Sequence, residues 1–379
     1  MSSYLVSISA AHSLETGALA IFFIGWTIES MWVGAVRMIL VPALLLNDTV
    51  PRPAVLIAVG CALSIPLVAA VLLTSGDLPL LVRWLLALSV VTLGAYEMAR
   101  SLLSRTVTRA LALPLADAIV FFAALVGILL GALAGADGLT VALASLCASS
   151  ALVTIAILSL ITLGRRGGTF EPLQAWLLVT WPLLRLGGLE WIVFFVTSSG
   201  GLALLGLLGG PNILAGVRLA ETLVAPIGLL SSALPFVVSS ALRADPSAVG
   251  PWPRAVRDVW LLLTIVTVAY LAAIQFAPSA ALRLLVGEHV EIARQASLGL
   301  ALGVVASVFG ATATLVMKHR RQVKTLARLR AVGLIVALPA VAIGASTGSV
   351  MGAGVGVSSS QLFPAIVQAG LTLRSKRSA

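Results

Sequence analysis

Seven ionisable side chains lie inside long apolar stretches of the sequence. Three are arginines and four are carboxylic acids: Arg37, Arg185, Arg218, Glu29, Asp117, Glu190 and Glu221. A guanidinium group forms two parallel hydrogen bonds with a phosphate or a carboxylate, so the arginines are candidates for binding an anionic group. The carboxylates are candidates for balancing these arginines or for holding a proton or a sodium ion. Each such charge costs about 2.5 to 3.5 kcal/mol at the centre of a membrane helix, which makes all seven candidates for a functional site.

A structural role is the alternative for two pairs of these side chains. Arg218 and Glu221 are three positions apart, and Arg185 and Glu190 are five positions apart. Each pair can therefore form an ion pair within one helix. Arg185 can also extend its charged end to the membrane surface.

Arg37 has a weaker structural explanation. The only carboxylate in its own apolar stretch is Glu29, eight positions away, which is about 12 Å along a helix. Glu97 and Arg100 lie at the predicted end of another helix, where we expect both to be solvated. Arg37 is therefore the arginine whose position most favours a ligand.

The composition surrounding these residues is that of a membrane protein. Of the 379 residues, 60% are hydrophobic and 10% are charged, and the mean hydropathy is +1.11. Soluble domains carry about 25% charged residues, so a solvated surface cannot be assembled from this sequence. Lipid must be the main solvent, and the chain is predicted to be an all-α integral membrane protein with almost no extramembrane domain.

Apolar stretches of about 20 residues predict eleven complete spans. The expected spans are 17–46, 54–74, 78–98, 110–134, 139–163, 186–208, 212–242, 256–277, 296–317, 325–345 and 348–372. Between the fifth and sixth spans, residues 173–184 form a shorter apolar stretch that is broken by Pro182. We predict that this stretch lies at the membrane surface, with Trp176 and Trp181 at the level of the lipid headgroups.

The basic residues predict the orientation of the chain. Most of the 24 Lys and Arg residues fall in alternate predicted loops and in the C-terminal tail. Cytoplasmic loops carry such an excess, so these loops and the C-terminus are predicted to be cytoplasmic and residues 1–16 to lie outside. The net charge of +10 then follows from topology, and no nucleic-acid partner is predicted.

The two halves of the sequence resemble each other. The basic loops 100–109 and 318–330 each lead into a helix that ends in a hairpin of small residues, at 135–138 and at 344–348. This pattern predicts two parallel repeats in a two-lobed bundle, an arrangement that places a substrate path between the lobes. In the first repeat, residues 1–13 correspond to the tail of a first helix that is otherwise missing. That helix has been lost, or the true start codon lies upstream, which we slightly favour.

The predicted domains follow from these repeats. They are an N-terminal lobe, an interfacial linker, a C-terminal lobe and a basic cytoplasmic tail, at residues 1–163, 164–185, 186–372 and 373–379. Catalytic and metal-binding motifs are absent from the sequence. Cys61 and Cys147 lie in apolar runs and the three histidines are scattered, so neither a metal nor another cofactor is predicted.

Several loose apolar motifs along the chain carry a family resemblance. They occupy residues 14–20, 34–37, 41–42, 215–220, 225–226, 234–235, 285–288 and 344–356. Together they resemble the multidrug, oligosaccharidyl-lipid and polysaccharide exporter superfamily, and within it the bacterial polysaccharide-export proteins that are similar to O-antigen flippases. The family has twelve or fourteen helices in two lobes, and this sequence departs from it by lacking most of the first helix.

The resemblance implies a transporter of a lipid-linked saccharide. Such proteins move undecaprenyl-pyrophosphate-linked saccharides across the bacterial plasma membrane by alternating access, for the synthesis of cell-surface polysaccharide. The implied partners are the lipid-linked saccharide, membrane lipid and enzymes of glycan synthesis, with H⁺ or Na⁺ as a possible coupling ion. By the predicted topology a pyrophosphate arriving from the cytoplasm meets Arg37 and Arg185 first, and Arg218 near the outer side.

Three other functions are compatible with the sequence. A cation-coupled multidrug exporter of the same superfamily would need a net acidic cavity, against which three buried arginines argue. A membrane glycosyltransferase would need acids or histidines on an outer loop, and residues 278–295 supply Glu288, His289 and Glu291. A non-transporting scaffold for polysaccharide assembly is favoured by the missing first helix.

Overall fold

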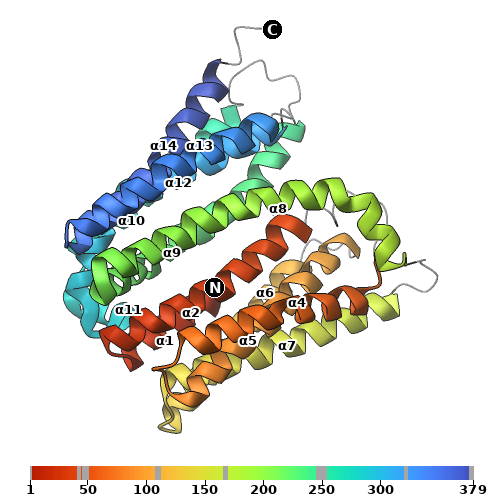
Figure 1. The fold of residues 1–379 in the computed structure, drawn as a ribbon, viewed down its shortest axis with the longest axis horizontal. Coiled ribbons are helices and arrows are strands. Elements are labelled where there is room, and N and C mark those ends of the chain that lie inside the picture. The colour runs from red at the N-terminus through yellow and green to blue at the C-terminus, as the bar shows by residue number, and fades with distance from the viewer. Residues whose placement is uncertain are drawn as a thin grey trace. The chain divides into compact units, whose positions relative to one another are not determined.

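The computed structural model describes residues 2–40, 44, 51–106, 112–164, 170–244, 254–319 and 323–374. These residues are almost entirely helical, as Figure 1 shows. They fall into two compact units, Met1–Phe195 and Val196–Ala379. The boundary lies inside one long helix, α8 (Leu173–Leu204), and the predicted lobe boundaries at residues 163 and 186 stay predictions.

The first unit begins with a short helix and continues with long apolar ones. In order they are α1 (Ser2–Ser13), α2 (Thr16–Ala35), the π-helix η1 (Val36–Leu40), α4 (Pro53–Thr74), α5 (Leu80–Thr106), α6 (Ala112–Leu133), α7 (Gly138–Gly164) and most of α8. Within this unit α5 packs against α7, α4 and α2, and α6 packs against α7. α5 therefore lies at the centre of the contacts that hold the unit together.

The second unit contains the end of α8 and the helices that follow it. They are the π-helix η2 (Leu205–Gly209), α9 (Gly210–Ala244), α10 (Arg254–Phe276), α11 (Ser279–Val286), the 3₁₀ turn η3 (Gly287–His289), α12 (Val290–His319), α13 (Val323–Ser346) and α14 (Val350–Arg374). Here α12 packs against α14, α9 and α10, and α13 packs against α14. The helices of this unit thus have the same order of neighbours as α2 to α7.

The prediction of an all-helical membrane protein is confirmed. Within the described residues, eight helices are long and apolar enough to cross a membrane, and Leu115–Gly131 and Trp260–Phe276 are two shorter apolar helices. Large apolar side chains are exposed on them, including Leu73, Leu133 and Phe276, which are 83% to 87% exposed. Such a surface is suited to lipid. The count of eleven complete spans stays a prediction.

The region 173–184 differs from its prediction. α8 runs through it without a break and contains Pro182, because a proline is tolerated inside an apolar helix whose other backbone groups stay paired. Trp176 is fully buried and Trp181 is 62% exposed, and their position at the level of the headgroups stays a prediction. The tryptophan at 176 is therefore a packing residue of α8.

Both predicted hairpins of small residues are present. Gly135 ends the turn after α6 and Gly348 ends the turn after α13, and each has φ of +69°, a conformation that glycine adopts without strain. Asp137 accepts hydrogen bonds from the backbone N–H and the hydroxyl of Thr140, at 2.8 and 2.6 Å, and so caps α7. Ser349 accepts one from the N–H of Gly352 at 3.0 Å and caps α14. Polar N-caps of this kind satisfy the first free amides of a helix.

Candidate functional site

Three polar side chains on the last turns of α5 begin the candidate site. Tyr96, Glu97 and Arg100 lie on a helix that continues to Thr106, beyond the end predicted at residue 98. Because the helix goes on and packs against α2, α4 and α7, Glu97 is only 3% exposed. The expectation that Glu97 and Arg100 are solvated is wrong for Glu97, and Arg100 is only half-buried.

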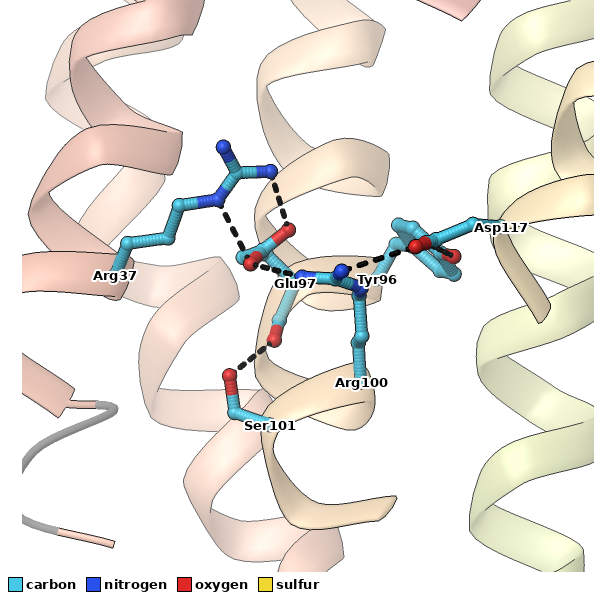
Figure 2. A network of polar contacts seen from close by, with 6 residues as sticks. All are labelled: Arg37, Tyr96, Glu97, Arg100, Ser101 and Asp117. Atoms are coloured by element: carbon cyan, nitrogen blue, oxygen red, sulfur yellow. Dashed lines mark hydrogen bonds and ion pairs between the residues drawn. The ribbon is translucent and has the colours of Figure 1, made fainter. Parts of the chain in front are cut away.

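Glu97 is held by two arginines from opposite sides, as Figure 2 shows. Arg37 Nε donates to Glu97 Oε1 at 2.8 Å and Arg37 Nη2 donates to Oε2 at 3.0 Å. Arg100 Nη1 donates to Oε1 at 3.2 Å. The carboxylate thus receives three charge-assisted hydrogen bonds, which is the condition under which a buried charge is tolerated.

Asp117 on α6 completes the cluster. Arg100 Nη2 donates to Asp117 Oδ2 at 2.9 Å, and the Tyr96 hydroxyl donates to Asp117 Oδ1 at 2.6 Å. Two positive and two negative groups therefore join η1, α5 and α6 into one chain of contacts. We call Arg37, Tyr96, Glu97, Arg100 and Asp117 the charged network.

Arg37 lies on an unusual piece of helix. It is the second residue of the π-helix η1, and the N–H of Val36 points at the carbonyls of both Trp32 and Val33. Just before it, the indole N–H of Trp191 on α8 donates to the carbonyl of Met31 at 3.1 Å. Single π-helical turns inside α-helices occur frequently at functional sites.

Exposure divides the members of the charged network. The Arg37 side chain is 57% exposed, whereas its partner Glu97 is 4% exposed. Figure 2 shows the third guanidinium nitrogen, Nη1, pointing away from Glu97, and among the described residues no hydrogen bond uses it. The accessible side of the Arg37–Glu97 pair is therefore positive.

Glu29 lies two turns before Arg37 and is buried. Its exposure is 3%, and the hydroxyl of Ser30 lies 3.4 Å from Glu29 Oε2. Arg37 and Glu97 are the charged groups whose fields reach it. Glu29 therefore borders the charged network without a direct ion pair to it.

The second unit contains a simpler arrangement on α9. Arg218 Nη1 donates to Glu221 Oε2 at 2.5 Å, and the side chains are 19% and 37% exposed. The two residues are one helical turn apart on the same helix, so their ion pair lies within α9. This geometry is that of the ion pair within one helix, which was the structural alternative for Arg218 and Glu221 in the sequence analysis.

The remaining two candidates lie on α8. Arg185 is exposed, and the side chain of Glu190 lies outside the described residues. The structure thus brings Arg37 and Asp117 together through Glu97 and Arg100, and it brings Arg218 and Glu221 together. No contact between described side chains joins Arg185 to either group.

Sequence reasoning missed the centre of the charged network. Glu97 and Arg100 are three positions apart on a helix, a spacing that signals an internal pair, and Tyr96 stands beside them. The spacing was visible in the sequence. The contact of Arg37 with Glu97 was not, because it joins residues 60 positions apart and depends on how their helices pack.

The outer loop proposed for an enzyme has an ion pair of its own. Glu288, in η3, lies 3.7 Å from Arg283 on α11, and both side chains are well exposed. In the part of the chain that the structure describes, no three His, Cys, Asp or Glu side chains gather as metal ligands would.

Solved membrane transporters of the MOP superfamily, the exporter superfamily that the sequence resembles, share this fold. An inward-facing multidrug-resistance MATE family transporter matches with a TM-score of 0.69 at 15% sequence identity, over 100% of this chain and 96% of that one. The lipid II flippase MurJ in an inward closed conformation matches with a TM-score of 0.68 at 12% identity, over 97% and 84% of the two chains. A MOP superfamily transporter from Pyrococcus furiosus, described by the reverse polarity of its binding pocket, matches with a TM-score of 0.61 at 15% identity, over 100% and 92%.

The likeness at these identities establishes the fold. No protein-family model matches the sequence, and no curated protein matches it at a significant level. The chain is a multi-pass helical membrane protein with the MOP transporter fold.

Proposed function

We propose that this chain, which has the fold of MOP transporters, moves a pyrophosphate-linked lipid saccharide across a bacterial plasma membrane by alternating access. The carrier lipid is undecaprenyl pyrophosphate and the product serves cell-surface polysaccharide synthesis. The C-terminus and the basic loops face the cytoplasm, which agrees with the bias of Lys and Arg along the sequence.

The observation that carries this proposal is the half-exposed side chain of Arg37. It lies at the end of an apolar helix, in a fold shared with exporters and with a lipid II flippase. Its buried partner Glu97 accepts hydrogen bonds from Nε and Nη2, and Nη1 points away from the carboxylate. A phosphate oxygen is a suitable acceptor for such a donor.

The charge that a ligand can reach favours an anionic cargo over a cationic drug. Of the pair, the Arg37 side chain is 57% exposed and that of Glu97 is 4% exposed, so the arginine is the member of the pair that a ligand can reach. The multidrug-exporter alternative requires the opposite polarity. Among solved proteins with this fold, one is described by a reverse polarity of its binding pocket.

The architecture that goes with the proposal is eleven complete spans in two parallel repeats. Two arginines support the repeat: Arg83 near the start of α5 donates to the carbonyl of Leu72 at the end of α4, at 2.8 Å. Arg294 near the start of α12 donates to the carbonyl of Ala277, directly after α10, at 2.6 Å. In each half an arginine near the start of one helix thus binds a backbone carbonyl at the C-terminal end of the helix before it. Cations are favourable at helix C-termini.

Reconstitution into liposomes tests the proposal against its alternatives. The substrate is a fluorescent undecaprenyl-pyrophosphate-linked saccharide, and its crossing is read with a membrane-impermeant quencher. We expect crossing with the wild type and none in protein-free vesicles. Efflux of a cationic dye without lipid crossing would favour the multidrug exporter, and neither movement would favour the scaffold. Sugar transfer without an added transferase would favour the enzyme.

A further inference from the structure

We propose that Arg37 is a releasable latch whose guanidinium is drawn from Glu97 by a pyrophosphate group, and that this release frees the π-helical segment Val36–Leu40 from α5. The proposal rests on the proposed function, since it names the contact that the anionic cargo displaces. It assigns Tyr96, Arg100 and Asp117 as positioning residues that keep Glu97 in place.

The charged network is built so that one member can leave. If Arg37 departs, Glu97 still accepts the hydrogen bond from Arg100 Nη1 at 3.2 Å. The buried carboxylate therefore keeps a counter-charge, and the large cost of an unpaired buried ion is avoided. Arg37 itself is already 57% exposed, so it loses little by turning toward another anion.

The other side of Glu97 is fixed. Arg100 is held by Asp117 at 2.9 Å, and Asp117 is held by the Tyr96 hydroxyl at 2.6 Å. The hydroxyl of Ser101 donates to the backbone carbonyl of Glu97 at 2.7 Å, one turn along the same helix. The contacts of Asp117 join α5 to α6, and that of Ser101 lies within α5. None of them involves Arg37, so they persist when the latch opens.

The backbone that carries Arg37 is suited to a local change. η1 is wound as a π-helix, which departs from the regular hydrogen-bond pattern of the α-helix before it. Upstream, Trp191 anchors α2 through the carbonyl of Met31. The Arg37–Glu97 pair ties η1 to α5, so loss of this pair affects Val36–Leu40 first and leaves α2 in place.

A pyrophosphate is the anion that can compete for Arg37. It carries more charge than one carboxylate and offers oxygens to two guanidinium nitrogens at once. Nη1 points away from Glu97, so a first contact can form before the bonds to Glu97 break. Binding and release are therefore parts of one exchange of partners.

The test uses the full chain in phospholipid nanodiscs with inorganic pyrophosphate as the probe. Two quantities are measured on each sample: equilibrium binding of radiolabelled pyrophosphate, and hydrogen–deuterium exchange of the peptide that contains Val36–Leu40. The variants are Glu97→Gln and Arg37→Lys. Arg218→Gln is the matched control for the exchange measurement, since it breaks an Arg–Glu pair that lies within one helix.

We expect pyrophosphate to accelerate exchange in Val36–Leu40 of the wild type several-fold. Glu97→Gln should exchange fast without pyrophosphate and should bind it roughly tenfold more tightly, because the competing charge is gone. Arg37→Lys, which cannot make the two-pronged contact, should exchange fast and bind more weakly. Arg218→Gln should leave exchange in this segment as in the wild type.

Two results separate the latch from the proposed function. If the wild type binds pyrophosphate but Glu97→Gln binds it no more tightly, or exchange in Val36–Leu40 does not respond, the latch is wrong and the anionic cargo stands. If the wild type binds no pyrophosphate, the premise of an anionic cargo is wrong and the latch falls with it.

Discussion

The two units differ in the kinds of contact that join some of their helices. In the first unit an ion pair joins η1, which follows α2, to α5, and a second ion pair joins α5 to α6. In the second unit α9 meets α12 through Ala220, Ala296 and Leu300, which form an apolar cluster. α12 meets α14 through backbone: a Cβ on Gly299 would lie 2.4 Å from the carbonyl oxygen of Met351.

The two kinds of helix contact differ in whether a ligand can break them. An ion pair with an exposed member can be broken by a competing charge, whereas helices packed at backbone distance lose their contacts only if they separate. The hydroxyl of Ser358 adds to this packing by donating to the carbonyl of Gly299 at 2.6 Å and accepting from the N–H of Gly303 at 3.1 Å. We therefore expect the charged network to respond to a ligand and the α12–α14 contact to remain fixed.

The largest effect is expected from adding one methyl group to the second unit. In Gly299→Ala the new Cβ meets backbone atoms of α14 that cannot move aside, so the free energy of unfolding should fall by about 3 kcal/mol. Denaturant titration in detergent, followed by tryptophan fluorescence, measures it. Gly310→Ala on the same helix is the control, because its Cβ would lie at an ordinary 3.4 Å from Ala365. Equal stability of the two variants would contradict close packing at Gly299.

Loss of the Glu97 carboxylate should have the next largest effect. Glu97→Ala leaves Arg37 and Arg100 without their shared partner, and we expect a loss of about 2 kcal/mol, less than for a fully buried pair because both arginines are partly exposed. The same titration measures it. A stability equal to that of the wild type would show that the ion pair does not hold η1 to α5. It would also contradict the proposed difference between the two units.

The two hairpins should differ in their response to pH. Burial alone would raise the pKa of Asp137, but the hydrogen bonds from Thr140 outweigh it and hold the pKa below the ordinary value of 3.8. The cap is therefore fully effective above that value and is lost as the pH falls through the lowered pKa. Asp137→Ala should cost about 1 kcal/mol at pH 7, and the difference from the wild type should shrink only below about pH 4.

Ser349→Ala is the matched variant in the second unit. Its hydroxyl caps α14 without a charge, so the stability difference between Ser349→Ala and the wild type should be independent of pH. Denaturation of the variants at pH 7, 5 and 3.5 makes the comparison. A parallel decline of both differences would contradict the assignment of the pH response to the Asp137 cap.

The smallest effect is expected at the ion pair within α9. Arg218→Gln removes a contact between two residues of one helix, and such pairs contribute about 0.5 kcal/mol. Loss of more than about 2 kcal/mol, a size expected of a buried pair, would show that Arg218 ties helices together as Arg37 does. Its effect on stability is therefore the baseline for that of Glu97→Ala.

Local patterns of the sequence predicted much of the fold. The apolar stretches, the glycines at 135 and 348 and the loose motifs identified a helical membrane protein with two small-residue hairpins, because each signal depends on neighbouring residues only. The break predicted at Pro182 was wrong, since α8 continues through this residue. Which faces of a helix are buried depends on the helices that pack against it, and the sequence alone does not identify these.

The candidate site was predicted less completely. Arg37 and Asp117 were identified because a charge in an apolar stretch is costly wherever the helix packs. Glu97, which joins them, was assigned to a helix end because its burial follows from contacts with α2, α4 and α7. The π-helical winding of Val36–Leu40 was not predicted from the residue types.

The central claim is that Arg37 binds the pyrophosphate of the transported lipid. The rate at which an Arg37 variant moves the lipid headgroup across a membrane tests this claim most directly. Liposomes containing the wild type, Arg37→Gln or Arg83→Gln are loaded with a fluorescent undecaprenyl-pyrophosphate-linked saccharide, and the crossing rate is measured with an impermeant quencher. Arg83 caps α4 through backbone carbonyls and lies outside the charged network, so Arg83→Gln controls for the loss of one arginine from the first unit. We predict that crossing falls at least about tenfold in Arg37→Gln, the equivalent of one lost charge-assisted contact, and remains near the wild-type rate in Arg83→Gln. Equal crossing in Arg37→Gln and the wild type would contradict the account.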